Sequence, residues 1–139
     1  MSDPLYKREL LRLAADAHGA GSLEGPHAHG SAHNPACGDK IEMDVAIAHG
    51  RIAALAHQTR ACVLTQASAS ILGKEAKGLD RGGVEALRRE VTAMLADSAK
   101  APAAPFDAYA ALEGAAPFRN RHTCVLLPIE ALLAAFDRT

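Results

Sequence analysis

The sequence predicts an α+β fold, in which a small antiparallel sheet of about three strands is covered by helices. Residues 40–48 alternate apolar and polar side chains, the period of a half-buried strand. The segments beyond residue 63 instead space their apolar residues at helical intervals, and strands followed by helices favour the α+β class. Ala supplies 31 of the 139 residues and aromatic residues only five, which suits closely packed helices.

Caps and apolar spacing predict the remaining elements. Asp3 and Pro4 are favourable N-cap and first-turn residues for a helix. Thr65 can cap a second helix, and Pro128 is expected to open the last one. The predicted elements, in chain order, are a helix over 4–17, a loop with room for a short strand, strands over 40–48 and 51–59, and helices over 65–76, 83–97, 106–112 and 128–136.

Length and charge narrow the function classes. The length is typical of one domain, so residues 1–139 are expected to form a single domain. Fifteen basic and sixteen acidic residues give a net charge of −1 without a basic stripe, which argues against a nucleic-acid partner. No apolar run is long enough to span a membrane and no secretory signal is visible, so a cytoplasmic protein with reduced thiols is expected.

The three cysteines are the first candidates for chemistry. Cys37 precedes the strand predicted over 40–48, Cys62 stands between the strand over 51–59 and a helix, and Cys124 is expected just before the last helix. Side chains at the ends of separate elements can converge on one site, and an odd number of thiols does not form a disulfide framework. A shared site and three unrelated thiols both remain open on placement alone.

Asp39 strengthens the case for a shared site. Gly38 lets the chain turn tightly between Cys37 and Asp39, so that a thiolate and a carboxylate could reach one ion. Three thiolates and one carboxylate suit tetrahedral Zn²⁺, and thiolates also bind iron–sulfur clusters. The alternative is that Asp39 only closes an Asx-turn.

Two motifs carry a family resemblance. Residues 34–39 read Asn-Pro-Ala-Cys-Gly-Asp, and residues 62–70 read Cys-Val-Leu-Thr-Gln-Ala-Ser-Ala-Ser. With a third Cys before a terminal helix, they resemble the iron–sulfur cluster assembly scaffolds of the NifU N-terminal, IscU and SufU group, over nearly the whole chain. The resemblance implies a SufU/IscU-like fold and a metal site built from Cys37, Asp39, Cys62 and Cys124.

The SufU branch is the most similar. Cys62 and Cys124 are 62 residues apart, which leaves room for an extra segment around residues 79–112 that resembles SufU. Arg121 fits the Arg-x-Lys-Cys pattern of that branch. The chain departs from it at Thr123, where related proteins carry Lys or His, and this departure bears on partner choice more than on metal binding.

The resemblance implies two mechanisms. A SufU-like protein holds Zn²⁺ and relays persulfide sulfur from a SufS-like cysteine desulfurase to recipient cluster-assembly proteins, with Cys37 as the expected sulfur acceptor. It would be an enzyme only as a zinc-dependent sulfurtransferase. An IscU-like scaffold instead takes iron and sulfur and builds a [2Fe–2S] cluster on the same residues. A zinc-stabilised adaptor without transfer chemistry is a third reading.

Several basic residues could have either a functional or a purely structural role. His122 could tune Cys124 or replace Asp39 as a ligand, and Arg121 could pair with a carboxylate, lower a thiolate pKa or simply be an exposed charge. His57 is expected to lie on a strand surface. The three residues His27, His29 and His33 could bind a transition metal, although a solvated loop is the preferred interpretation.

Overall fold

Three antiparallel strands form the sheet that the sequence predicted. The structure, a computed structural model, describes residues 8–25, 27–36 and 38–138. Strands β1 (Ala28–Asn34), β2 (Asp39–Ala48) and β3 (Arg51–Arg60) pair in that order, so β2 is central. The α+β class and the three-stranded sheet are therefore confirmed.

The central strand β2 follows its sequence pattern closely. Ile41, Met43 and Val45 are completely buried beneath the helices, as the alternation predicted. His49 and Gly50 join β2 to β3, and both have a positive φ, which is typical of a two-residue hairpin turn. The hairpin was therefore predicted at its correct place.

Strand β1 was foreseen only as a short strand within a loop. Its sequence, AHGSAHN, carries little apolar pattern, yet it pairs with β2 from Ala28 opposite Val45 to Asn34 opposite Asp39. Gly30 explains part of this, because a Cβ there would lie 2.4 Å from the carbonyl oxygen of Ala131. The strand thus packs directly against the backbone of a helix.

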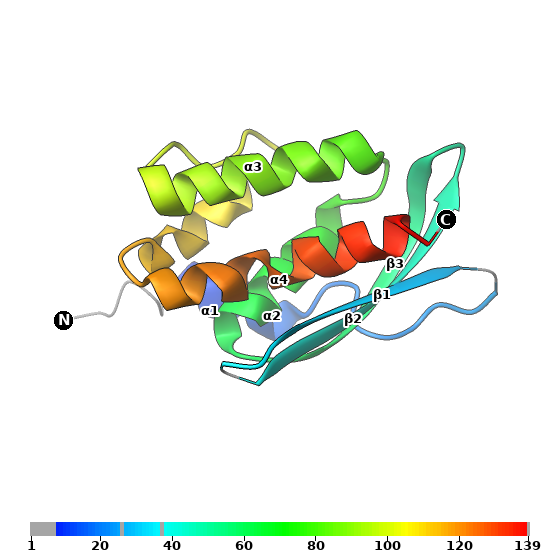
Figure 1. The fold of residues 1–139 in the computed structure, drawn as a ribbon, viewed down its shortest axis with the longest axis horizontal. Coiled ribbons are helices and arrows are strands. Elements are labelled where there is room, and N and C mark those ends of the chain that lie inside the picture. Colours follow the sequence, from blue (N-terminus) through cyan, green and yellow to red (C-terminus); the bar gives the residue numbers. More distant parts are fainter. Residues whose placement is uncertain (1–7, 26, 37, 139) are drawn as a thin grey trace.

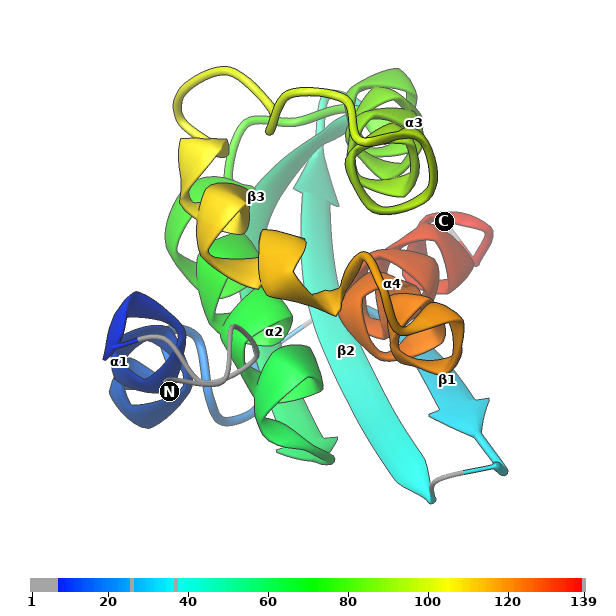
Figure 2. The same cartoon turned by 90° about the vertical axis from the view of Figure 1, so that its left-hand side faces the viewer.

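The helices lie on one side of the sheet (Figures 1 and 2). Helices α2 and α4 pack side by side against the strands, α1 flanks α2, and α3 flanks α4. The 3₁₀ segment η2 bridges the helices at one end. Their bounds are α1 Arg8–Asp16, α2 Val63–Glu75, α3 Arg81–Asp97, η2 Asp107–Ala115 and α4 Arg119–Phe136.

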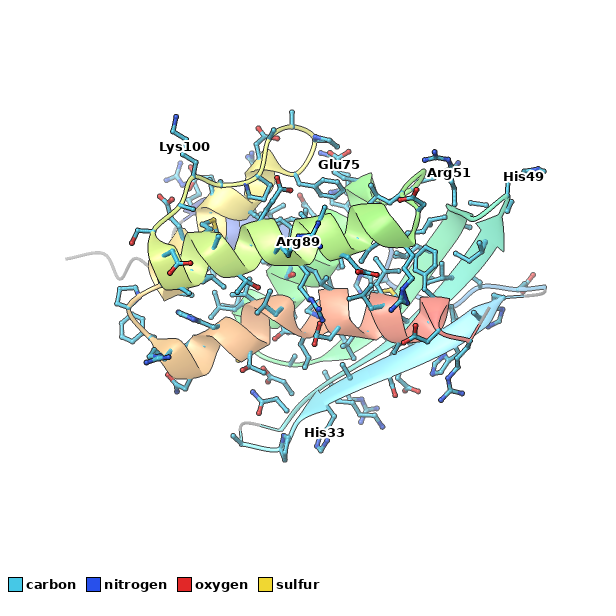
Figure 3. All side chains as sticks on the ribbon, turned by 45° about the horizontal axis from the view of Figure 1, so that its top comes forward. His33, His49, Arg51, Glu75, Arg89 and Lys100 are labelled. Atoms are coloured by element: carbon cyan, nitrogen blue, oxygen red, sulfur yellow. The ribbon has the colours of Figure 1, made fainter. Side chains whose placement is uncertain are left out.

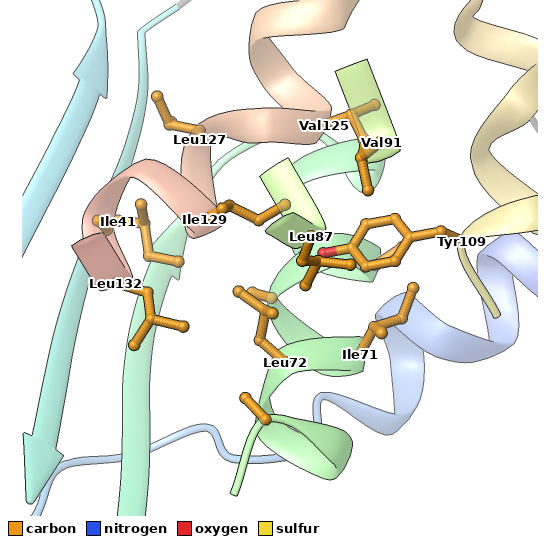
Figure 4. Close-up of a cluster of buried hydrophobic side chains, with 14 of the residues drawn as sticks. Ile41, Ile71, Leu72, Leu87, Val91, Tyr109, Val125, Leu127, Ile129 and Leu132 are labelled. Atoms are coloured by element: carbon orange, nitrogen blue, oxygen red, sulfur yellow. The ribbon is translucent and has the colours of Figure 1, made fainter. Parts of the chain in front are cut away.

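Small and branched side chains fill the core between these layers (Figure 4). The only large aromatic ring that is completely buried among the described residues is that of Tyr109, whose hydroxyl lies 2.8 Å from the Ser68 hydroxyl. Charged side chains such as Arg89 and Lys100 point outward (Figure 3). Within the described ranges, no helix combines the length and apolar character needed to cross a bilayer.

Two predicted helix boundaries were wrong. Helix α2 begins at Val63 with Cys62 as its N-cap, so Thr65 lies inside its first turn and does not cap it. Helix α4 begins at Arg119, and Pro128 lies in its interior. A proline normally interrupts a helix because it has no N–H to donate. Here α4 continues through Pro128. Because the helix already begins at Arg119, Cys124 lies within α4 and not, as had been predicted, before it.

The predicted N-terminal helix is present over the part of its range that the structure describes. Helix α1 spans Arg8–Asp16, while the first residues of the predicted range 4–17 lie outside the described part of the chain. Ala17 has a φ of 45°, a left-handed conformation that ends the helix. The loop that follows then runs back along β3, where Ala20 forms a parallel bridge with His57.

Candidate metal centre

Three of the four predicted ligand residues come together. One ligand atom each from Asp39, Cys62 and Cys124 lies within 4.8 Å of the other two, so these residues could hold a metal ion. They come from the first residue of β2, the N-cap of α2 and the second turn of α4. Asp39 and Cys124 are 4% and 1% exposed, while Cys62 is half-buried. The fourth predicted ligand, Cys37, lies outside the described residues.

The turn between β1 and β2 places Asp39 at this point. The Gly38 N–H donates to the Asn34 carbonyl at 2.8 Å, and the Asn34 side chain accepts from the Ala36 N–H at 3.1 Å. Gly38 has a φ of 74°, a conformation that glycine adopts without strain. The tight turn expected at Gly38 is therefore present, and β2 begins beside the start of α2.

Helix α2 orients the carboxylate of Asp39. Its Oδ1 accepts a hydrogen bond from the Cys62 N–H at 3.1 Å, and its Oδ2 lies 3.1 Å from the hydroxyl oxygen of Thr65, which can donate to it. These bonds satisfy polar groups at the helix N-terminus, where the positive end of the helix dipole also stabilises an anion. Asp39 is thus fixed by a helix that follows more than twenty residues later in the chain.

The electrostatics of the site favour a cation. Burial raises the pKa of the Cys124 thiol, and its hydrogen bond to Asp39 and the nearby Cys62 thiol raise that pKa further. Deprotonating several acidic groups at one buried point requires a compensating positive charge. Two sulfur ligands and one carboxylate match the donors that Zn²⁺ and iron accept in proteins.

The three residues before Cys124 differ in their exposure to solvent. His122 is half-buried, and its Nε2 lies 2.8 Å from the Ala116 carbonyl, to which it can donate. That bond ties the start of α4 to the end of η2. Arg121 is also half-buried, whereas Thr123 is exposed. The tuning roles suggested for Arg121 and His122 stay predictions, because His122 is not part of the cluster of three ligand atoms.

Sequence reasoning missed the role of Thr65. Its buried hydroxyl contacts Asp39 and also donates to the Cys124 carbonyl at 2.9 Å. The signal was present, since a residue three positions after Cys62 lies on the same face of a helix. Because Thr65 was predicted to be the N-cap, its side chain was not expected to contact the candidate ligands.

The predicted placements of His57, His29 and His33 were incorrect, whereas His27 lies in an exposed loop as expected. His57 is 3% exposed, not a surface residue, because the loop after α1 covers it. His29 belongs to β1, and its Nδ1 lies 2.7 Å from Asp44 Oδ1. The histidines at 29 and 33 are therefore in a strand rather than a loop, and the described residues form no histidine metal cluster there.

Comparisons with known proteins agree with this geometry. The family described as "NifU-like N terminal domain" matches residues 5–125. No curated protein matches the chain. Among solved structures, the N-terminal part of a nitrogen-fixing NifU-like protein from Brucella abortus is 26% identical with a TM-score of 0.92, over 98% of this chain and 94% of that one.

Two further structures share the fold. A protein described only as hypothetical is 26% identical with a TM-score of 0.77, over 93% of this chain and 97% of the other. A candidate iron–sulfur cluster assembly scaffold protein for the SUF system, from Fervidobacterium islandicum, has a TM-score of 0.83 at 17% identity, over 98% and 99% of the two chains. With a family match that covers most of its length, the chain belongs to the NifU-like N-terminal domain family.

Proposed function

We propose that this protein takes part in iron–sulfur cluster assembly, through a metal site formed by Cys37, Asp39, Cys62 and Cys124. The observation that carries the proposal is the convergence of Asp39, Cys62 and Cys124 within 4.8 Å from three separate elements. Membership in the NifU-like N-terminal domain family supports it. So does the similarity of fold to a candidate SUF-system scaffold.

Cys37 completes the set. Consecutive Cα atoms are about 3.8 Å apart, so a residue two positions before Asp39 is close to the site by covalent connection alone. Its neighbours Ala36 and Gly38 are exposed. A thiol in such a turn is the one best placed to meet a partner protein, which supports Cys37 as the sulfur acceptor.

Within this function, we favour sulfur transfer with a SufS-like cysteine desulfurase. The Cys37 thiolate attacks the outer sulfur of the desulfurase persulfide, a new S–S bond forms on Cys37, and the desulfurase cysteine leaves as a thiolate. No external oxidant or reductant is needed. A bound Zn²⁺ would supply the positive charge that keeps the thiols deprotonated near neutral pH. The recipients would be other cluster-assembly proteins, and the compartment would be the cytoplasm.

Assembly of a [2Fe–2S] cluster on the same four residues is the second candidate. The carboxylate of Asp39 favours it, because a carboxylate binds soft metal centres less firmly than a fourth thiolate and leaves the site labile. Iron would then be cargo rather than a resident cofactor. The exposed Thr123 supports a third reading, a zinc-stabilised adaptor without transfer chemistry, because related proteins carry Lys or His there.

Metal analysis and reconstitution separate these candidates. Protein purified without chelator would be analysed for zinc and iron, then incubated anaerobically with iron, cysteine and a SufS-like desulfurase. One bound zinc with a faster desulfurase supports the relay, and a visible chromophore on the thiolates supports the scaffold. Zinc without stimulation supports the adaptor.

Variants of the ligands make the same experiment specific to the site. Asp39→Ala and Cys62→Ser are expected to lose metal, whereas Asp97→Asn, a change at an exposed carboxylate in α3, keeps it. A wild-type protein that binds neither zinc nor a cluster would refute the proposal. Cys37→Ser tests the acceptor: if it still took up desulfurase-derived sulfur while Cys124→Ser did not, Cys37 would not be the acceptor.

A further inference from the structure

The hydroxyl of Thr65 contacts all three of the described candidate ligands. Its Oγ1 lies 3.1 Å from Asp39 Oδ2, 2.9 Å from the Cys124 carbonyl oxygen and 3.7 Å from Cys62 Sγ. The residue is completely buried. One side chain of α2 therefore links the first residue of β2 to the second turn of α4.

Pro128 explains why the Cys124 carbonyl accepts this bond. In an α-helix, the carbonyl of residue i accepts from the N–H of residue i+4. For Cys124 that residue is Pro128, which has no N–H, although α4 continues through it. Leaving a buried carbonyl unbonded is destabilising, and the Thr65 hydroxyl donates to this one where Pro128 offers no N–H.

We propose that Thr65 is a positioning residue of the metal site, and that Pro128 keeps the Cys124 carbonyl available to it. The hydroxyl has one proton and two acceptors within reach. The orientation of the Asp39 carboxylate and the backbone position of Cys124 are therefore coupled through a single group. Outer groups of this kind orient metal ligands and set metal affinity. The inference rests on the proposed metal site.

Substitutions at Thr65 test the positioning role. Thr65→Val keeps the shape and removes the hydroxyl, and Thr65→Ser keeps the hydroxyl. Zn²⁺ affinity, measured by competition with a chromophoric chelator, should fall about 10-fold or more in the Val variant and recover in the Ser variant. The absorption spectrum of bound Co²⁺ should change and recover in the same way, which a purely structural role would not produce.

Two outcomes would overturn the positioning role. One is a Val variant with the wild-type affinity and Co²⁺ spectrum. The other is a Ser variant as impaired as the Val variant, since packing of the methyl group would then be the cause. Thr92→Val is the matched control, because Thr92 is exposed on α3 and its hydroxyl donates to the Arg88 carbonyl. This control should bind both metals like the wild type.

Pro128→Ala tests the second half of the proposal. It restores an N–H at residue 128, which can bond the Cys124 carbonyl within α4. The fold-loss of affinity caused by Thr65→Val should then be smaller in the Pro128→Ala background than in the wild type, leaving only the part due to Asp39. Equal losses in the two backgrounds would refute the role of Pro128.

Urea unfolding of the metal-free protein separates this inference from the proposed function. The cycle compares the wild type, Thr65→Val, Pro128→Ala and the double variant. Thr65→Val should lower the free energy of unfolding more in the wild type than in the Pro128→Ala background. Additive effects on unfolding, together with additive effects on affinity, refute the role of Pro128 even when metal binds. Failure of the wild type to bind zinc, cobalt or iron instead refutes the proposed function, and the unfolding cycle still decides the coupling of Thr65 to Pro128.

Discussion

The buried imidazole of His57 is bonded to the carbonyl of His18, which precedes it by 39 residues. Nε2 lies 2.8 Å from this carbonyl and therefore carries the proton, while Nδ1 lies 2.9 Å from the Thr59 hydroxyl and can accept from it. The backbones are joined as well, because the His57 N–H donates to the Gly19 carbonyl at 2.9 Å. The loop after α1 is thus held on β3 by a neutral histidine.

This burial predicts a pH dependence of stability. Burial lowers the pKa of His57 below its ordinary value of 6.5, while the bond to the His18 carbonyl raises it in part. The unfolded chain therefore binds more protons than the folded chain as the pH falls through 6.5, so the free energy of unfolding should fall with it. Above that pH the contribution of His57 is constant.

Urea unfolding between pH 7.5 and 5 measures this effect. The wild type should lose more stability over that interval than His57→Gln, which has no titratable ring. His49→Gln is the matched control, because His49 is exposed in the hairpin turn. A His57→Gln slope as steep as that of the wild type would contradict the assignment.

Gly73 permits the same loop to approach α2. A Cβ at this position would lie 1.9 Å from the His18 carbonyl oxygen, so Gly73→Ala must displace the loop. We expect a loss of about 1–3 kcal/mol in the free energy of unfolding. Gly82→Ala in α3 is the control, since its nearest neighbour is 3.7 Å away, and it should be neutral or stabilising. Equal effects in the two variants would contradict this account.

Tyr109 and Ser68 form a second testable pair. Tyr109→Phe removes the partner of the buried Ser68 hydroxyl and should destabilise the protein by about 1–3 kcal/mol. Adding Ser68→Ala removes the other polar group, so the double variant should be destabilised by less than the sum of the single changes. Thermal or urea unfolding of the four proteins measures the coupling. Strictly additive losses would mean that the hydroxyls do not depend on each other.

If Asp39 is a metal ligand, removing its charge should change the rate of metal release and the metal affinity. Asp39→Asn keeps the size of the side chain and an acceptor for the Cys62 N–H, but removes the negative charge. A chelator should extract the metal faster from this variant, and the affinity should fall by at least about 10-fold. Removing metal should lower the melting temperature of the wild type more than that of Asp39→Asn, because bound metal stabilises the folded state. Identical extraction rates would exclude Asp39 as a ligand.

The sequence predicted those parts of the fold that local pattern determines. The alternation of residues 40–48 and the turn at His49 and Gly50 identified the β2–β3 hairpin, since both signals act over a few residues. The motif around Asp39 and Cys62 identified two of the three side chains that converge. Cys124 was assigned to the same site, but its place inside a helix was not foreseen.

Contacts between distant segments account for what was missed. Proline is normally a helix boundary, yet α4 continues through Pro128, and a hydroxyl from another helix bonds the carbonyl of Cys124, four residues before it. His57 became buried because of a loop that lies far earlier in the chain. Strand β1 has a weak apolar pattern, and its pairing depends on close packing of Gly30 against α4. In each case the contacting residue is too far away in the sequence to affect a local pattern of apolar and polar residues.

The three converging side chains stand at the beginnings of β2 and α2 and near the beginning of α4. An ion shared among them would act as a further non-covalent crosslink between segments that packing and a few hydrogen bonds already join. Its release would loosen three element termini at the same time. The stiffness of this corner of the molecule would therefore depend on whether the site holds an ion.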